Sequence, residues 1–227
     1  MLYLYQAQAG QSQLSLEGDD HRYIFKVRRH KVDDTLYLRN LEDGLLHRYL
    51  ITYIDKKSVH LSLQESSTLE VKAKQSLHIG WCVIDPKSVE KVLPSLNEMG
   101  VEKITFIYCK RSQNSFKLDF KRLEKILLNS SQQSGRSHMM KLEIAKDLQH
   151  FLADYPESKM LNFSEHNFIG TATVDTIVIG CEGGFHEDEV ALFDAQNIVG
   201  FDTALVLKSE SAVCPKFKSE MQPLSSK

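Results

Sequence analysis

The feature that most constrains the fold is the stretch TIVIGCEGGFHEDE, which runs from Thr176 to Glu189. Its first part, Ile177–Ile179, consists of β-branched residues that suit a strand buried on both faces of a sheet. Three glycines follow: Gly180, Gly183 and Gly184. Glycine permits backbone angles that a Cβ atom would forbid, so a ligand can lie against bare backbone here. We therefore predict a strand, a tight turn and the start of a helix.

The spacing of these glycines excludes two common nucleotide-binding loops. A Walker loop needs a Lys followed by Ser or Thr after its glycines, and this stretch has none. The pattern also differs from the GxGxxG turn of dinucleotide-binding folds. A turn that only joins a strand to a helix is the alternative interpretation.

The composition predicts a soluble globular protein. The chain has 227 residues, of which 42% are hydrophobic and 26% charged, enough for one large or two small domains. No apolar run approaches the roughly 20 residues that span a bilayer. The N-terminal MLYLYQAQAG also lacks the basic flank and long apolar core of a signal peptide. We therefore expect a cytoplasmic protein that does not enter a membrane.

The cysteines are far apart in the sequence: Cys82, Cys109, Cys181 and Cys214. They contain no CxxC pair, which argues against a zinc cluster and against a disulfide framework. We predict four reduced thiols and no metal site.

The net charge of −2 argues against general nucleic-acid binding over the whole surface, so any RNA contact has to come from local clusters. One cluster, His21–Lys31, is rich in Arg and Lys and contains no acid. A second, Lys103–Lys125, holds basic residues against few acids and includes Lys110 and Arg111. Each cluster, taken alone, is equally consistent with an ordinary solvated face.

The first part of the chain has the pattern of a small β-barrel. Short alternating strands dominate up to about residue 66, and Glu42–Gly44 predicts a hairpin turn. Asp19–Lys26 predicts a short helix with Asp19 as its N-cap. The polar stretch Gln64–Lys74 lacks an apolar period and is the predicted linker.

After this linker, strands and helices alternate, which predicts a parallel sheet covered on both faces. Pro86–Met99 has one apolar face and predicts a helix. Ile104–Cys109 predicts a buried strand, and Ala204–Leu207 a second apolar strand after the glycine stretch. Glu187–Ala195 predicts a helix between them.

Three motifs together resemble the RsmE family of 16S ribosomal RNA uridine methyltransferases, members of the knotted SPOUT class. GCEGGFHEDE is similar to the family's GPEGGFxxxE loop, and DTALVLKSESA to its LGxxILRxETA segment. SSQQSGRSHMM, into which a predicted helix with Leu123, Ile126 and Leu127 on its apolar face runs, resembles AxEQSGRxxxP. The chain departs from the family at Cys181, at Asp202 and Thr203, and at Lys208, where the family has Pro, Leu-Gly and Arg.

The resemblance implies an α/β protein with an N-terminal PUA-like β-barrel over residues 1–66. A SPOUT-type knotted domain with a parallel sheet is implied over 75–227. The implied activity is transfer of a methyl group from S-adenosylmethionine to N3 of a uridine in 16S ribosomal RNA, within the small ribosomal subunit. A homodimer in the cytoplasm is implied as well.

The family motifs also imply site residues. Those expected to bind the cofactor, mostly through main-chain groups, are Ile179, Gly180, Glu182, Gly183, Gly184, Leu205, Val206 and Leu207. Those expected to contact RNA are Arg22, Lys26, Arg28, Arg29, Lys110 and Arg111. Methylation at N3 requires a deprotonated uracil, and Arg136 is the candidate catalytic residue because arginine stays charged beside an anionic ring.

Two other functions remain open from the sequence. A noncatalytic RNA-binding or ribosome-assembly protein that keeps the fold is favoured by the departures at Thr203, Lys208 and Pro215. A different α/β enzyme that uses the glycine loop for a small molecule would leave both basic clusters unexplained.

Overall fold

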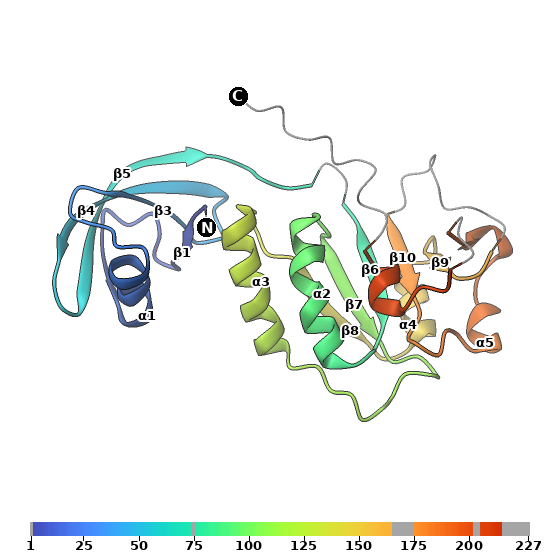
Figure 1. The fold of residues 1–227 in the computed structure, drawn as a ribbon. Coiled ribbons are helices and arrows are strands. Elements are labelled where there is room, and N and C mark those ends of the chain that lie inside the picture. Colours follow the sequence, from blue (N-terminus) through green and yellow to red (C-terminus); the bar gives the residue numbers. More distant parts are fainter. Residues whose placement is uncertain (1, 74–75, 165–174, 202–204, 215–227) are drawn as a thin grey trace. The chain divides into compact units, whose positions relative to one another are not determined.

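The computed structural model describes residues 2–73, 76–164, 175–201 and 205–214 (Figure 1). The chain forms two compact units. Unit 1 consists of residues 1–72 and 128–139, and unit 2 of residues 73–127 and 140–227.

Unit 1 is built on a curled five-stranded sheet with the order β1-β3-β4-β5-β2. Its strands are β1 (Leu4–Tyr5), β2 (Gln13–Glu17), β3 (Thr35–Arg39), β4 (Leu45–Ile54) and β5 (Ser58–Thr68). The pairs β3–β4, β4–β5 and β2–β5 are antiparallel, and β1 pairs with β3 in parallel. The hairpin turn predicted at Glu42–Gly44 is confirmed, because β3 and β4 flank it.

The predicted linker begins too early. Residues 64–68 belong to β5, and Thr68 pairs with Leu45, the first residue of β4. A ladder is held by main-chain hydrogen bonds, so the polar side chains of this stretch do not prevent a strand. The expected linker is therefore shorter than the sequence pattern suggested.

A short helical segment follows β2. It consists of α1 (Gly18–His21) and the π-helical η1 (Arg22–Val27), so the predicted helix at Asp19–Lys26 is present. The predicted cap is wrong, since Glu17 holds the N-cap position and its side chain makes no capping hydrogen bond. Gly18 has φ of +60°, a conformation that favours glycine and turns the chain from strand into helix.

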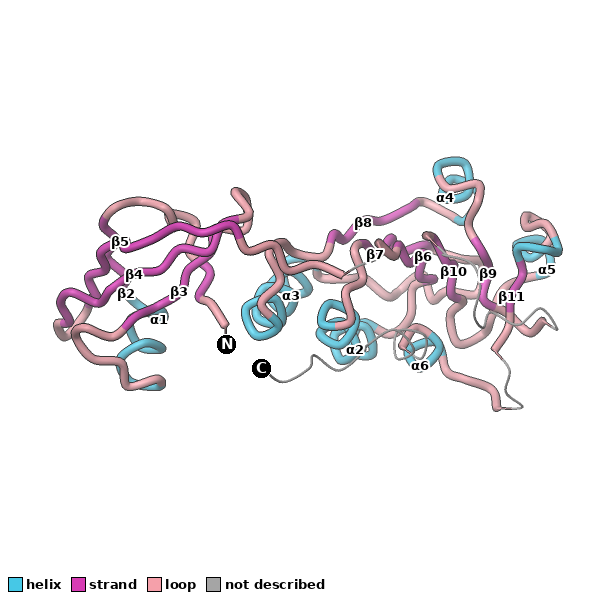
Figure 2. The backbone as a smooth tube through the Cα atoms, turned by 90° about the horizontal axis from the view of Figure 1, so that it is seen from above, coloured by secondary structure: helices cyan, strands magenta, loops and turns pink. Residues whose placement is uncertain are grey.

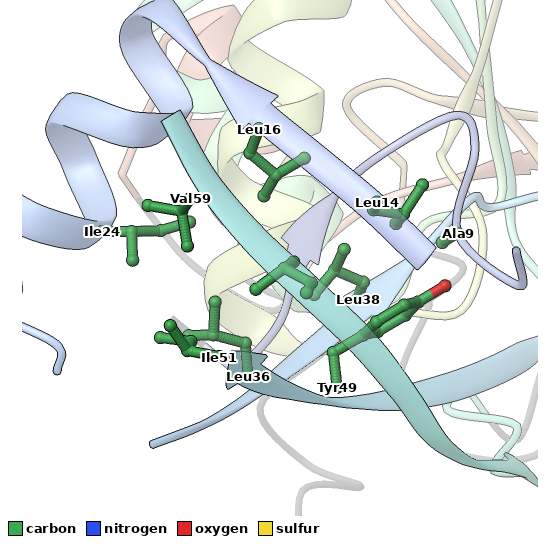
Figure 3. Close-up of a cluster of buried hydrophobic side chains, with 10 residues drawn as sticks. Ala9, Leu14, Leu16, Ile24, Leu36, Leu38, Tyr49, Ile51 and Val59 are labelled. Carbon is green, nitrogen blue, oxygen red and sulfur yellow. The ribbon is translucent and has the colours of Figure 1, made fainter. Parts of the chain in front are cut away.

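The core of unit 1 lies between the sheet and this helical segment (Figure 3). It contains side chains from every strand except β1, joined by Ile24 from η1 and Ala9 from the loop before β2. The buried ring of Tyr49 extends from this cluster, and its hydroxyl accepts from Gly10 N at 2.9 Å and donates to Gln11 O at 2.7 Å. Tyr49 therefore closes the loop before β2 onto the core.

Unit 2 contains a six-stranded sheet with the order β11-β9-β10-β6-β7-β8, in which all pairs are parallel. The strands are β6 (His78–Cys82), β7 (Lys103–Ile107), β8 (Lys141–Ala145), β9 (Lys159–Leu161), β10 (Thr176–Ile179) and β11 (Ile198–Val199). The helices are α2 (Pro86–Glu98), α4 (Leu148–Asp154), α5 (Glu187–Val190), η2 (Ala195–Asn197) and α6 (Ser209–Ala212). A further helix, α3 (Phe120–Ser134), begins in unit 2 and ends in unit 1.

The predicted parallel sheet with two covered faces is confirmed. Figure 2 shows α2 and α6 on one face of the sheet and α4 on the other. The helix predicted at Pro86–Met99 is also confirmed, and it starts at an N-cap, Asp85, whose carboxylate accepts from Ser88 N at 3.1 Å. These elements follow from local pattern, because their apolar spacing matches the period of each structure.

Two predictions for the end of the chain are wrong. Leu205–Leu207 is not a strand, and Ala204 lies outside the described residues. Leu205 and Val206 are 73% and 77% exposed, so their apolar character does not reflect burial in the sheet. The helix expected over Glu187–Ala195 ends at Val190 and is followed by η2.

The reduced state predicted for all cysteines is also wrong. Cys82 and Cys109 form a disulfide, whereas Cys181 and Cys214 are free. Cys82 ends β6 and Cys109 follows the neighbouring β7, which brings their Cα atoms within 5.7 Å. The spacing of the cysteines in the sequence does not reveal this disulfide, because Cys82 and Cys109 come close only when β6 and β7 are neighbours in the sheet.

In the described part of the chain, no helix combines the length and apolar character needed to cross a membrane. The same residues contain no group of three or more His, Cys, Asp or Glu side chains arranged to hold a metal ion.

Replacing Tyr49 by Phe should lower the free energy of unfolding by about 0.5–1.5 kcal/mol, because the loop would lose the hydrogen bonds that Gly10 N and Gln11 O make with the Tyr49 hydroxyl. Urea unfolding measures this change. Tyr53→Phe is the control, since Tyr53 is 56% exposed on the same strand. Equal stability of the two variants would contradict the role given to the Tyr49 hydroxyl.

Candidate cofactor site

The candidate site lies in unit 2, where the chain leaves the carboxyl ends of neighbouring parallel strands. β10 is followed by the glycine segment, defined as Gly180–Phe185, and β7 by Cys109–Ser112. β6 lies between these two strands in the sheet. In open α/β sheets, ligands bind at this edge, beyond the carboxyl ends of the strands.

The glycine segment forms a tight turn. Gly184 N donates to Cys181 O at 2.9 Å, and Gly184 has φ of +68°. At Gly180, a Cβ atom would lie 3.1 Å from the Phe185 ring and 3.4 Å from Gly184 Cα. Turn geometry therefore accounts for glycine at both positions.

Gly183 differs from these two glycines. Its φ is not positive, and a Cβ atom there would make only ordinary contact, at 3.4 Å from the Cβ of Arg111. The residue is exposed at the surface of the turn. Nothing in the described structure requires glycine at this position, so the bare backbone of Gly183 is available for close approach by a ligand.

Side chains from the segment after β7 fix the glycine segment. Arg111 Nη1 donates to Gly183 O at 2.7 Å. The buried carboxylate of Glu189 accepts from Lys110 N at 2.8 Å and from His186 N at 2.9 Å. One carboxylate thus joins the start of α5 to the segment after β7, next to the glycine segment that precedes α5.

The two basic residues predicted to bind RNA in unit 2 both contact this region. Arg111 bonds the carbonyl of Gly183, and the Lys110 ammonium pairs with Asp188. The hydrogen bond from Lys110 and its positive charge lower the pKa of Asp188. Contact of Lys110 and Arg111 with RNA stays a prediction.

A buried chain of hydrogen bonds ties α6 to the glycine segment. Trp81 Nε1 donates to Ser209 Oγ at 2.9 Å, and the Ser209 hydroxyl donates to Gly180 O. An indole N–H only donates, so the single hydroxyl proton of Ser209 is left for the carbonyl. Trp81 is fully buried on β6 and pairs with Ile179 of β10.

Ser209 also locates the second predicted cofactor loop. It follows Leu205–Leu207 by one residue, Lys208, which is the N-cap of α6. The bond from Ser209 to Gly180 therefore brings the end of this loop to the glycine segment. Among the other predicted cofactor residues, Ile179 is buried in β10 and Glu182 is exposed on the turn.

Sequence analysis did not select Trp81, Glu189 or Ser209 as site residues. Ser209 lies inside the second motif, DTALVLKSESA, which points to this loop but does not show that Ser209 bonds to Trp81 and Gly180. Trp81 is 128 positions away from Ser209, and Lys110 is 79 positions from Glu189. Only the order of strands in the sheet brings these residues together.

The thiol of Cys181 lies in the turn but is not activated. Burial raises the pKa of this thiol, which keeps it protonated at neutral pH. Cys181 therefore contributes backbone and packing rather than a nucleophile.

The candidate catalytic residue, Arg136, lies in unit 1. It follows α3, is 4% exposed, and its carbonyl accepts from the Tyr3 hydroxyl at 2.8 Å. Burial raises the pKa of Tyr3 to about 12, against the opposing charges of Arg39 and Arg136. A catalytic role for Arg136 stays a prediction.

The basic residues predicted to bind RNA in unit 1 are all exposed on or just after η1: Arg22, Lys26, Arg28 and Arg29. Arg28 Nε donates to the Tyr23 hydroxyl at 2.6 Å, and its guanidinium lies 5.5 Å from the centre of the Tyr23 ring. This arrangement is compatible with phosphate contacts, which stay a prediction.

Ser209→Ala should loosen the glycine segment, because Gly180 O and Trp81 Nε1 would lose a buried partner at a cost of about 1–3 kcal/mol. Hydrogen exchange should then be about 5- to 100-fold faster at the Gly184 amide. Mass spectrometry of the peptide covering 180–185 measures this. Ser211→Ala, an exposed position in the same helix, is the control. Equal exchange in both variants would rule out the coupling.

Comparison with known proteins places this chain in a family. Residues 71–215 match the family model of an RNA methyltransferase domain, and residues 16–64 match that of an RNA methyltransferase PUA domain. Ribosomal RNA small subunit methyltransferase E of Helicobacter pylori is 38% identical over 216 residues, covering 93% of this chain and 96% of the relative. The protein of the same name from Rickettsia conorii is 26% identical over 204 residues, covering 84% and 81%.

Solved structures share the fold. Ribosomal RNA small subunit methyltransferase E from Neisseria gonorrhoeae, bound to S-adenosylmethionine, has a TM-score of 0.79 at 17% identity, with 96% of each chain covered. A putative methyltransferase from Legionella pneumophila, also with S-adenosylmethionine, has a TM-score of 0.78 at 21% identity and the same coverage. The two matched domains and the close Helicobacter relative show that this chain belongs to the RNA methyltransferase family of ribosomal RNA small subunit methyltransferase E.

Proposed function

We propose that this protein methylates N3 of a uridine in 16S ribosomal RNA of the small ribosomal subunit, with S-adenosylmethionine as methyl donor. The observation that carries the proposal is the exposed backbone of Gly183, in a turn fixed at the carboxyl edge of a parallel sheet. Membership of the family supports the reaction, and the base and its position come from the family resemblance.

The residues present fit the methyl donor. The predicted contacts are mostly main-chain groups, and the bond from Ser209 to Gly180 connects the two loops that hold them. These residues are Ile179, Gly180, Glu182, Gly183, Gly184, Leu205, Val206 and Leu207. Gly183 is exposed, and a Cβ atom there would lie 3.4 Å from the Cβ of Arg111, so the absence of a side chain keeps the space between the turn and Arg111 open. S-adenosylmethionine supplies a sulfonium methyl group when bound.

The protein has to hold uracil so that N3 faces that methyl group. Neutral N3 is a poor nucleophile, so loss of its proton must accompany transfer. We assign Arg136 to stabilise the anionic ring, because a guanidinium keeps its charge and donates two hydrogen bonds to oxygen acceptors. Orientation of the two reactants alone contributes about 7–11 kcal/mol in favourable cases.

RNA affinity is assigned to the basic residues. Arg22, Lys26, Arg28 and Arg29 are proposed to contact phosphates from the PUA-like domain, residues 1–66. Lys110 and Arg111 are proposed to do so from the methyltransferase domain, residues 75–227. Such contacts supply affinity and orientation rather than base choice.

Three further properties follow from the family resemblance: a trefoil knot in the second domain, a homodimer, and a cytoplasmic location. Sedimentation of the purified protein tests the dimer directly.

A second candidate is a noncatalytic RNA-binding protein with the same fold. It is favoured by Lys208, which stands at the N-cap of α6 in place of the family's Arg. Thr203 and Pro215, which also favour it, lie outside the described residues. Cofactor binding separates the two candidates.

Calorimetric titration with S-adenosylmethionine should show micromolar binding to the native protein and at least tenfold weaker binding to Gly183→Val. The valine side chain would fill the space between the turn and the Arg111 side chain, while the φ angle at this position does not require glycine. An unchanged melting temperature would confirm that the variant is folded. Native affinity in a folded variant would remove Gly183 from the site, and no binding to the native protein would favour the noncatalytic candidate.

Reversing Arg28 and Arg29 to Glu should weaken binding to a 16S rRNA fragment. If both side chains contact phosphate, the slope of log K against log salt should become shallower by about 1.4–1.8. Lys87→Glu with Lys91→Glu makes the same charge change on the exposed face of α2 and is the control. A slope equal to that of the native protein would show that Arg28 and Arg29 only face solvent.

A further inference from the structure

Unit 1 contains a hollow that none of the predicted site residues line. It is lined by Phe25, His30, Lys31, Val32, Ile54, Asp55 and Lys56, and its volume is about 430 Å³. These residues come from η1, from the loop before β3, from the end of β4 and from the turn between β4 and β5. The volume is in the range of small-ligand sites, which run from about 300 to 1,000 Å³.

An aromatic ring stands at this hollow in a fixed position. Phe25 is 44% exposed, and its ring stacks on His21 with centroids 5.7 Å apart and an interplanar angle of 27°. His21 is buried, and its Nε2 is 3.0 Å from the carbonyl oxygen of Asp55. The exposed ring is therefore backed by a second ring that the β4–β5 turn holds in place.

The remaining lining combines apolar and cationic groups. Val32 and Ile54 supply apolar surface, while Lys31 and Lys56 are exposed. Neither lysine forms an ion pair with any residue that the structure describes. These two ammonium groups are available to an anionic partner.

The acidic groups beside the hollow are used within their own turns. Asp55 accepts from Lys57 N and Ser58 N, each at 2.7 Å, and these bonds lower its pKa. Asp34 accepts from Lys31 N at 2.9 Å and lies 3.1 Å from His30 Nδ1. Both carboxylates stabilise the loops that shape the hollow, and neither binds the ammonium of Lys31 or Lys56.

We propose that this hollow binds an unstacked base of single-stranded RNA, with the base against Phe25 and the flanking phosphates at Lys31 and Lys56. Sequence-specific RNA recognition commonly uses unpaired bases that stack on aromatic side chains. An exposed ring with a cationic rim complements a base and its phosphates, whereas the cationic rim disfavours a purely apolar partner. The proposal rests on the RNA-binding function proposed above.

The first test is affinity for a short single-stranded oligouridine as a function of salt. Phe25→Leu should raise Kd about 5- to 100-fold without changing the salt slope, because stacking involves no counterion release. Phe25→Tyr keeps an aromatic face and should bind like the native protein. Tyr37→Leu is the matched control, since Tyr37 is also 44% exposed in unit 1 and does not line the hollow.

The second test uses the rim. Lys31→Gln with Lys56→Gln should make the salt slope shallower by about 1.4, the value for two phosphate contacts on a single strand. This test decides the matter if Phe25→Leu fails to fold. A duplex RNA of the same length should not respond to Phe25→Leu, because its bases are paired.

The outcomes separate this proposal from the proposed function. Native affinity for RNA in Phe25→Leu, together with an unchanged slope in the lysine variant, would overturn the hollow as a base site while RNA binding stands. No RNA binding by the native protein would overturn both proposals at once. Equal losses in Phe25→Leu and Tyr37→Leu would show a general effect of surface aromatics and would also overturn it.

Discussion

The order of strands in the parallel sheet is the constraint on which the candidate site depends. β10, β6 and β7 are neighbours, so their carboxyl ends meet at one edge although they are far apart in the sequence. Main-chain hydrogen bonds fix the strands but end where the chain leaves the sheet. Beyond that point, side chains have to hold the segments in place.

At the glycine segment, buried polar side chains hold the chain in place. Glu189 accepts main-chain hydrogen bonds from two separate segments, and Ser209 links an indole to a carbonyl. Each bond contributes only about 0.5–1.5 kcal/mol net, but a buried polar group left without its partner costs more. Removing one partner of such a bond therefore destabilises the fold by more than the net free energy that the bond contributes. This asymmetry favours one defined arrangement of the turn, which a ligand contacting bare backbone requires.

In unit 1, an apolar core rather than a set of buried polar bonds supports the exposed basic and aromatic side chains. A curled, mostly antiparallel sheet and a short helical segment enclose an apolar core (Figure 3). The basic residues are exposed on or just after this helical segment. The His21–Phe25 stack is an example, because the buried His21 ring packs against the exposed Phe25 ring and supports it. Charge and aromatic surface thus occur together on a small rigid unit, as single-stranded RNA recognition requires.

The sequence alone determined the class of fold and predicted the glycine segment as the candidate site. Alternation of strand and helix predicted the covered parallel sheet, and the run of β-branched residues into glycines predicted the turn after β10, because both signals are local periodicities of the chain. Family motifs pointed to the cofactor loops. The same local reasoning failed for Leu205–Leu207, whose apolar side chains are exposed, and for residues 64–68, whose polar side chains belong to a strand.

Only the tertiary structure decided which distant residues meet. The Cys82–Cys109 disulfide, the carboxylate of Glu189 on Lys110 N, and the link from Trp81 through Ser209 to Gly180 all join segments that no local pattern connects. It also distinguished Gly183, where glycine is free of any turn requirement, from Gly180 and Gly184. The physical reason is that these contacts depend on strand order and register, which arise from packing of the whole sheet rather than from neighbouring residues in the chain.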